Sequence, residues 1–196
     1  DHKRIFEGDH GPNTGGMGAY SPAPVVTPDI EKEILEKVFM PIVREFRDLG
    51  HPYKGFLYAG IMVTSSSTAS RHTTGPTASP SGFKVLEFNV RLGDPETQVL
   101  LPRLKNDLLE VLLAAAGGYL SEVKLEWKDE DCVCVVIASQ GYPEEYEVGK
   151  KIAGIPTAKE NPDIQVFHAG TKREGGELVT AGGRVLNVVG CGRGIF

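Results

Sequence analysis

Three polar residues stand at every second position of one predicted strand. In VLEFNVRLGDPETQ, residues 85–98, they are Glu87, Asn89 and Arg91. Side chains alternate across a strand, so these three share one face. The positions between them are apolar and predict a buried opposite face: Leu86, Phe88 and Val90.

A carboxylate and an amide carbonyl two residues apart suit one Mg²⁺ ion, which takes one or two protein oxygens beside substrate phosphates. The guanidinium of Arg91 could then fork onto a carboxylate or a phosphate next to the metal. The N-terminus of a helix starting near Glu96 would line the same pocket. The competing interpretation is an exposed sheet face with ordinary polar residues, and the spacing alone leaves both open.

The segment GPNTGGMGAY, residues 11–20, is the second candidate. Its glycines permit close backbone approach to an anion, and Asn13 and Thr14 supply hydrogen-bonding groups. It has no Gly-Lys-Ser/Thr ending and follows no predicted strand, so it is neither a P-loop nor a Rossmann fingerprint. A structural turn is an equally good interpretation. The polar start DHKR, which contains Lys3, is also ambiguous because such residues are usually solvated.

An amphipathic pattern predicts a helix over residues 27–50. Thr27 can cap it, Pro28 suits its first turn, Gly50 suits its end, and Pro41 should kink it. A second helix should begin near Glu96 and continue to Gly117-Gly118. We expect three special positions in it, a cap, a first helical residue and a kink: Asp94, Pro95 and Pro102.

Two strands are predicted at residues 55–64 and 83–91. The stretch between them, residues 65–82, is rich in Ser and Thr and predicts a mobile loop. From about Trp127 the chain changes to short strands and turns, which indicates a second, β-rich module.

The composition is that of a soluble globular protein, with 40% hydrophobic and 24% charged residues. The net charge of -5 gives no reason to expect a nucleic-acid surface. No apolar run reaches the roughly 18 residues of a membrane span, and no signal peptide is recognisable. Cys132 and Cys134 should point the same way from a strand. A zinc half-site is one interpretation, but a buried, reduced pair is favoured, which suggests a cytosolic setting.

Several stretches together closely resemble the glycinamide ribonucleotide synthetases, also called phosphoribosylamine–glycine ligases, which are ATP-grasp enzymes of purine biosynthesis. The resemblance covers residues 1–64 and 83 to about 190, and the run from GFKVLEFN to LPRLKND is specific to the family. The matching stretches are DHKR, GDHGPNTGGMGAYSPAP, GFLYAGIMVT, VLEFNVRLGDPETQVLLPRLKNDL, ASQGYP and FHAGT…GGRVL.

The resemblance implies an α+β fold: the second ATP-grasp lobe, an antiparallel sheet with helices, over residues 1–127, and a small β-rich C-terminal domain over residues 128–196. It also implies that the N-terminal domain and first ATP-grasp lobe precede this chain, so we expect the chain alone to be inactive. The parent protein could carry other purine-pathway domains. The implied reaction ligates glycine to 5-phosphoribosylamine through glycyl phosphate, with ATP and Mg²⁺ or Mn²⁺, in the cytoplasm.

Roles for individual residues follow from the same resemblance. The neighbouring strand FLYAGIMV offers no carboxylate, which leaves Glu87 and Asn89 as the metal ligands. Arg91 should hold the glycyl carboxylate or the transferring phosphoryl group, and Asp94 should cap the helix and orient Arg91. The residues expected around substrate are Lys3, Asn13, Thr14, Gly15, Gly16 and Arg91.

This chain departs from the family pattern in two places. The family usually joins the two strands by a tight turn, where residues 65–82 stand here, and its usual NARFGDPE reads NVRLGDPE. Two alternatives remain: an ATP-grasp ligase for other substrates, such as a biotin-dependent carboxylase, and a non-catalytic ATP-grasp remnant that acts as a binding or interaction module. The GPNTGGMGAY and RLGDPETQ stretches together argue against the carboxylase.

Overall fold

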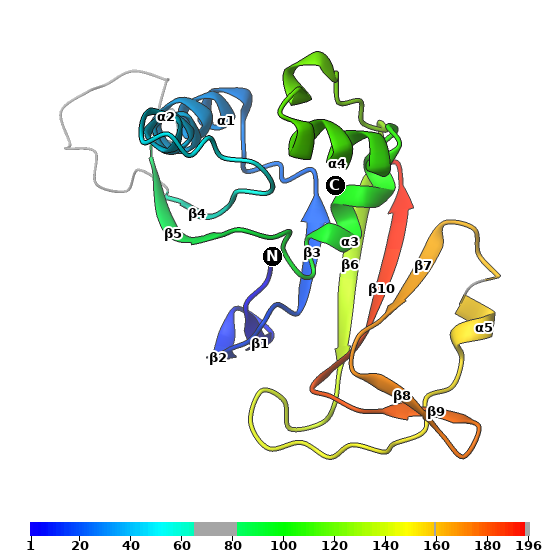
Figure 1. Cartoon of the computed structure of the whole chain (residues 1–196). Coiled ribbons are helices and arrows are strands. Elements are labelled where there is room, and N and C mark those ends of the chain that lie inside the picture. The colour runs from blue at the N-terminus through cyan, green and yellow to red at the C-terminus, as the bar shows by residue number, and fades with distance from the viewer. Residues whose placement is uncertain (65–81, 159, 195–196) are drawn as a thin grey trace. The chain divides into compact units, whose positions relative to one another are not determined.

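The computed structural model of the protein describes residues 1–64, 82–158 and 160–194, and the chain divides into two compact units (Figure 1). The first unit consists of Asp1–Pro22, Gly93–Glu110 and Val123–Phe196. The second unit consists of Ala23–Leu92 and Val111–Glu122. The predicted loop at residues 65–82 lies, apart from Gly82, outside the described residues. The predicted domain boundary at residues 127 and 128 is a different division of the chain and stays a prediction.

A four-stranded antiparallel sheet organises the first unit. Its order is β3 (Gly18–Ser21), β6 (Asp131–Ala138), β10 (Arg184–Gly192) and β7 (Ile164–His168). The residues of β6 alternate between buried and more exposed positions, as its Val, Cys and Ile content predicts. The β-rich texture predicted after Trp127 is therefore real, but β3 from the start of the chain completes the sheet.

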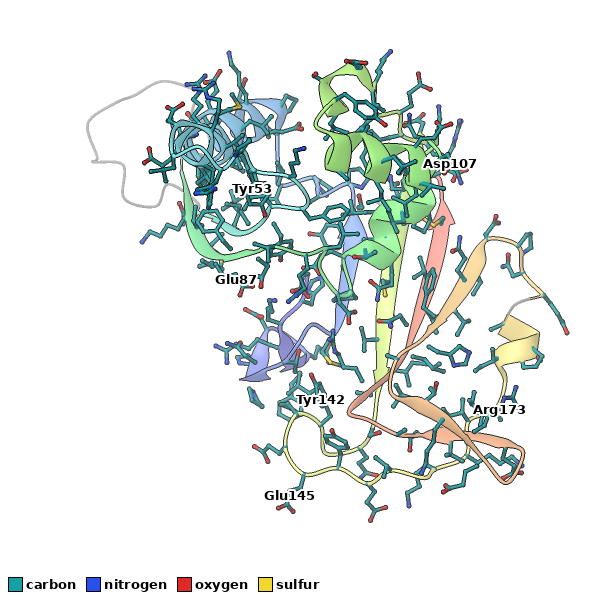
Figure 2. The ribbon with its side chains drawn as sticks, in the orientation of Figure 1. Tyr53, Glu87, Asp107, Tyr142, Glu145 and Arg173 are labelled. Carbon is teal, nitrogen blue, oxygen red and sulfur yellow. A yellow bond between two sulfur atoms is a disulfide. The ribbon has the colours of Figure 1, made fainter. Side chains whose placement is uncertain are left out.

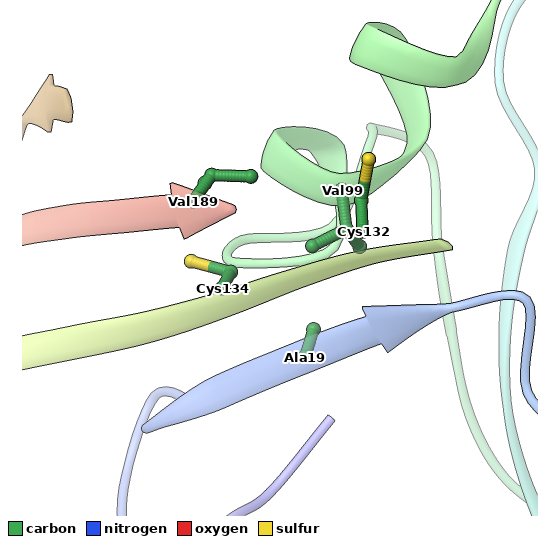
Figure 3. Close-up of a cluster of buried hydrophobic side chains, with 5 residues drawn as sticks. All are labelled: Ala19, Val99, Cys132, Cys134 and Val189. Atoms are coloured by element: carbon green, nitrogen blue, oxygen red, sulfur yellow. The ribbon is translucent and has the colours of Figure 1, made fainter. Parts of the chain in front are cut away.

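The core of this sheet is built around two central strands, β6 and β10. Side chains of β3, β6 and β10 meet Val99 of the short helix α3 (Thr97–Leu100). Figure 3 shows the resulting cluster, in which every side chain is at most 2% exposed: Ala19, Val99, Cys132, Cys134 and Val189. Close packing of this kind leaves little room for added atoms.

Short elements complete the first unit. Two hairpins are formed by β1 (Arg4–Phe6) with β2 (His10–Asn13), and by β8 (Thr171–Glu174) with β9 (Glu177–Thr180). The helix α5 (Ile155–Ala158) packs near β7, where Val166, Val185 and Leu186 form a second buried cluster.

The second unit begins with the predicted amphipathic helix. It consists of α1 (Pro28–Ile34), a π-helical segment (Leu35–Phe39) and α2 (Met40–Asp48). The Thr27 hydroxyl accepts the Ile30 N–H at 3.4 Å, and Gly50 ends the helix with a φ of 82°, so both predicted boundaries are confirmed. The π-helical segment ends two residues before Pro41, which has no N–H to donate.

The two predicted strands form an antiparallel ribbon in the second unit. They are β4 (Tyr58–Val63) and β5 (Phe83–Asn89). One face of the ribbon packs on the helix through Ala59, Ile61, Val63 and Phe83, around a buried cluster from the helix itself: Ile30, Ile34 and Val38. This packing fixes which face of the ribbon is covered by the helix.

The single kinked helix predicted from Glu96 to Gly117-Gly118 is wrong. The chain instead forms α3, a 3₁₀ turn at Leu101–Arg103, an extended residue at Leu104, then α4 (Leu108–Gly117) and a 3₁₀ turn at Leu120–Glu122. Leu104 forms a β-bridge with Trp127, and the Asn106 side chain bonds backbone groups of Lys124 and Glu126. These bonds replace the helical ones, and Asp107 accepts the Leu109 N–H at the new start.

The prediction of a reduced Cys132–Cys134 pair is also wrong. Cys132 and Cys134 are both buried in β6, but Cys132 forms a disulfide with Cys191, its cross-strand neighbour in β10. Spacing of two residues identifies cysteines on one face of a strand; it cannot identify a partner 59 residues away. The disulfide engages Cys132, which leaves no pair of thiols for the zinc half-site. The described residues also contain no group of three or more His, Cys, Asp and Glu side chains placed to hold a metal.

In the described part of the chain, none of the helices combines the length and apolar character needed to cross a membrane.

Candidate functional site

Strand β5 carries the two predicted metal ligands on the face of the ribbon turned away from Ala59. In the register of the ribbon, Asn89 lies opposite Tyr58 and Glu87 lies opposite Gly60. Figure 2 labels Glu87 on β5. A Cβ on Gly60 would lie 3.0 Å from Cγ of Glu87, so the Glu87 side chain extends over this glycine. The predicted shared face is thus present for Glu87 and Asn89, with two oxygen donors side by side.

The predicted buried face of β5 is wrong. Leu86, Phe88 and Val90 are 62%, 47% and 78% exposed. The register shifts beside Gly60, which makes Leu86 an extra residue without a cross-strand partner and breaks the simple alternation. A two-stranded ribbon with one helix also offers less cover than a full sheet.

Arg91 lies beyond the end of β5, so the alternation does not extend to it. Its Nη1 donates to the Leu92 carbonyl at 2.9 Å, and the residue is exposed. The prediction that one strand face carries all three polar residues therefore holds for two of them.

Asp94 does not cap a helix. The N-cap position of α3 is Glu96, without a side-chain capping bond, and Pro95 lies before it. The Asp94 carboxylate instead accepts Nε2 of Gln98 at 2.9 Å and Nη2 of Arg184 at 3.1 Å. These two donors occupy the carboxylate, so the predicted capping role of Asp94 is wrong. The predicted place of Pro95 at the first helical position is also wrong, because α3 starts after Glu96.

The segment at residues 13–18, here called the glycine loop, follows β2 and leads into β3. The backbone N–H groups of residues 14–17 all donate within the protein. Their acceptors are, in chain order, the Lys3 carbonyl at 2.7 Å, the Tyr142 hydroxyl at 3.1 Å, the Thr14 hydroxyl at 3.0 Å and the His2 carbonyl at 2.7 Å. The loop is therefore not arranged as a set of backbone donors for an anion. Lys3 lies on the neighbouring segment, with Nζ 2.8 Å from the Asp1 carboxylate.

Two residues that contact the glycine loop were not singled out by the sequence: Tyr142 and Arg184. Arg184 Nη1 donates to the carbonyls of Gly15 and Asp94, each at 3.0 Å. Both residues occur in the stretches ASQGYP and GGRVL, but Arg184 is 169 positions from Gly15 and no periodicity connects them. Only the sheet topology, in which β6 pairs with β3 on one side and with β10 on the other, brings them together.

The first unit also contains an open cavity of about 760 Å³ after β6. Polar side chains on its walls include Ser139, Gln140, Glu145 and Lys150. Figure 2 shows Tyr142 and Glu145 in the loop that borders it. Its volume is in the range of small-molecule sites.

The predicted site residues are distributed over both units. The first unit holds Lys3, Asn13, Thr14, Gly15, Gly16 and Asp94. The second unit holds Glu87, Asn89 and Arg91. In the first unit the Thr14 N–H donates to the Lys3 carbonyl, and Asp94 is connected to Gly15 through Arg184. In the second unit the three residues are close in the chain.

Comparison with known proteins agrees with this architecture. The family model "Phosphoribosylglycinamide synthetase, ATP-grasp (A) domain" matches residues 1–97, and the C-domain model of the same synthetase matches residues 132–195. Phosphoribosylamine–glycine ligase of Rhizobium meliloti is 48% identical over 193 residues, covering 98% of this chain and 42% of that protein. The ligase of Chlorobaculum tepidum is 49% identical over 191 residues, covering 97% and 41%.

The crystal structure of phosphoribosylamine–glycine ligase from Thermotoga maritima superimposes with a TM-score of 0.78 at 35% identity, covering 100% of this chain and 44% of that one. The chain thus spans about two fifths of the length of the relatives it matches. The α+β ATP-grasp fold class is confirmed, and these matches exclude the alternative of a biotin-dependent carboxylase. The chain belongs to the phosphoribosylglycinamide synthetase family.

Proposed function

We propose that the protein carrying these residues is a phosphoribosylamine–glycine ligase. A carboxylate oxygen of glycine attacks the γ-phosphorus of ATP, which gives glycyl phosphate and releases ADP. The amine of 5-phosphoribosylamine then attacks the glycyl carbonyl, phosphate leaves, and glycinamide ribonucleotide forms. The observation that carries this proposal is the match to both the ATP-grasp domain and the C domain of one synthetase, in a single chain.

The oxygen donors of β5 fit a divalent metal. Glu87 offers a carboxylate and Asn89 an amide carbonyl from one face of the strand, a set suited to Mg²⁺ or Mn²⁺ with further ligands from water and phosphate. Gly60, opposite Glu87, has no side chain to occupy the space over which the carboxylate extends. When bound there, the ion supplies charge neutralisation at the ATP phosphates.

The chain's own residues contribute by positioning and electrostatics, because this reaction needs no protein nucleophile. Arg91 is exposed and carries a fork of donors that suits a carboxylate or a phosphoryl group. Asp94 acts as a positioning residue through its ion pair with Arg184. Its predicted contact with Arg91 stays a prediction.

The residues around substrate are proposed to be Lys3, Asn13, Thr14, Gly15 and Gly16. Since the N–H groups of residues 14–17 donate internally, contact with substrate falls to side chains and carbonyls. Asn13 is exposed at the end of β2 and pairs with Arg4, the residue after Lys3, whose ammonium forms an ion pair with Asp1. A cytoplasmic location is also proposed from the reaction alone. Reduced cysteines no longer support it, because Cys132 forms a disulfide with Cys191.

The decisive experiment follows oxygen atoms in a complete synthetase that carries this segment. With glycine labelled by ¹⁸O in its carboxylate, one label should appear in inorganic phosphate for each glycinamide ribonucleotide formed. ADP release should require glycine and 5-phosphoribosylamine together. Omission of either substrate and replacement of glycine by alanine serve as controls.

Unlabelled phosphate during steady product formation would exclude glycyl phosphate. ADP release that ignores both substrates would exclude the ligase. Absence of ADP release and of product under all these conditions would favour the alternative of a non-catalytic binding module.

A further inference from the structure

One guanidinium joins the glycine loop to the corner that precedes α3. Arg184, the first residue of β10, donates through Nη1 to the carbonyls of Gly15 (3.0 Å), Gly16 (3.4 Å) and Asp94 (3.0 Å). Its Nη2 donates to Oδ2 of Asp94 at 3.1 Å, and its side chain is 23% exposed. The planar fork of an arginine can serve several acceptors that lie in different directions.

The two glycines of the loop make this contact sterically feasible. A Cβ on Gly15 would lie 2.9 Å from Cζ of Arg184, and a Cβ on Gly16 would lie 2.6 Å from Cδ of Pro95. Gly16 also has a φ of 116°, which side chains rarely adopt. These glycines are therefore needed for the approach of protein groups, rather than for the approach of an anion.

Tyr142 holds the same loop from a second direction. Its hydroxyl accepts the Gly15 N–H at 3.1 Å. The ring packs edge-on against Tyr146, with centroids 6.1 Å apart, and a Cβ on Gly183 would lie 2.2 Å from the ring. The residue before Arg184 must thus be small for the tyrosine to reach the loop.

We propose that Arg184, assisted by the Tyr142 hydroxyl, is a positioning residue that orders the glycine loop for substrate. Arg184 restrains the Gly15 and Gly16 carbonyls while Tyr142 restrains the Gly15 N–H, so Asn13 and Lys3 are presented in one arrangement. This inference rests on the proposed function, in which the glycine loop contacts substrate. A positioning role predicts that loss of the Arg184 contacts lowers the kcat/KM for 5-phosphoribosylamine far more than the affinity for ATP.

The test compares four variants of a complete synthetase carrying this segment. Arg184→Gln removes the charge and the fork, Arg184→Lys keeps only the charge, and Tyr142→Phe removes only the hydroxyl. The control is Arg173→Gln, which alters an exposed arginine of β8 that donates to the Gly176 carbonyl within its own hairpin turn. Each variant is measured for hydrogen–deuterium exchange at residues 13–18 and for kcat and KM of each substrate.

We expect faster exchange at residues 13–18 in Arg184→Gln and a smaller increase in Tyr142→Phe. The kcat/KM for 5-phosphoribosylamine should fall about 10- to 100-fold in Arg184→Gln, the range expected from displaced contacts, with the KM for ATP within about twofold. Arg184→Lys should recover little, because one ammonium cannot serve four acceptors. Arg173→Gln should match the parent protein in every measurement.

Unchanged exchange in Arg184→Gln, full recovery by Arg184→Lys, or equal losses for ATP and 5-phosphoribosylamine would each overturn the proposal. The exchange measurement needs no substrate. If the parent protein shows no ligase turnover, the proposed function is therefore wrong, while exchange still decides whether Arg184 and Tyr142 order the glycine loop.

Discussion

The two regions that carry the candidate residues are held together in different ways. The β4–β5 ribbon presents Glu87 and Asn89 through the alternation of a single strand, and several of its apolar residues remain exposed. The glycine loop is fixed by Tyr142 and Arg184, which are 127 and 169 positions from Gly15. A donor set made by one strand can be recognised from spacing, whereas a loop held by distant residues cannot.

The largest expected effect is on catalysis, at the ribbon. Glu87→Gln or Asn89→Ala in a complete synthetase should lower kcat about 10²- to 10³-fold, the usual consequence of losing one group that stabilises transferring charge. Stability should change little, because neither side chain belongs to the buried cluster of the second unit. Glu33→Gln, an exposed change on α1 in the same unit, is the control. The measurement is turnover at saturating Mg²⁺ together with the midpoint of thermal unfolding. Normal turnover in both variants would remove the metal assignment.

The next effect concerns the sheet that supports the glycine loop. The Cys132–Cys191 disulfide closes 59 residues of chain, and a loop of that length predicts a loss of about 4 kcal/mol of unfolding free energy when the bond is removed, if the effect is mainly on the unfolded state. Alkylation in denaturant without reductant should modify one cysteine, Cys134, and reduction should raise this to all three.

Urea unfolding of Cys191→Ser measures the loss. Three alkylated cysteines in the unreduced protein would show that Cys132 and Cys191 are thiols, and would leave the sheet dependent on packing alone.

These contrasts also explain how far the sequence could predict the structure. The helix from Pro28 and both ribbon strands followed from capping residues and periodicity, which are local. The end of the helical turn at Arg103 depends on hydrogen bonds from Asn106 to the Lys124–Glu126 segment. The Asp94 carboxylate accepts from Arg184 and does not cap a helix. Such outcomes depend on tertiary contacts that no window of sequence contains.

The exposure of Leu86 shows a second kind of limit. Strand periodicity assumes unbroken pairing, and one bulge beside Gly60 shifts every residue beyond it relative to the partner strand. The prediction that Glu87 and Asn89, the proposed metal ligands, share one face was unaffected, because both residues lie on the same side of the bulge.

Glycine substitutions compare the sheet with the ribbon through smaller changes in unfolding free energy. A Cβ on Gly18 in β3 would lie 2.6 Å from the Cys134 carbonyl, which belongs to a central strand and cannot move cheaply. Gly18→Ala should therefore cost about 1–3 kcal/mol of unfolding free energy. Gly60→Ala meets only the flexible Glu87 side chain at 3.0 Å, so it should cost less and act on turnover instead.

Gly192→Ala is the matched control, because its added Cβ meets nothing within 4 Å. Urea unfolding of the three variants checks the order. Equal losses at Gly18 and Gly60 would mean that the ribbon is as tightly constrained as the sheet.

The smallest expected effect is the pH dependence contributed by Cys134. Burial raises the pKa of its thiol from 9.0 to about 11, with a further upward contribution from Asp94. Between these two values the unfolded thiol loses its proton while the folded thiol keeps it. The folded state then binds more protons than the unfolded state, so the unfolding free energy falls as pH rises above about 9.

At pH 10 this predicts a loss of about 1 kcal/mol relative to pH 8. Other groups titrate in the same range, so the informative quantity is the difference between the parent chain and Cys134→Ala in urea unfolding at pH 8, 9 and 10. The unfolding free energy of the parent should fall by about 1 kcal/mol more than that of Cys134→Ala between pH 8 and pH 10, because alanine has no proton to lose. Parallel pH profiles would show that the Cys134 thiol ionises as readily in the folded sheet as in the unfolded chain, and that the core between β6 and α3 is open to water.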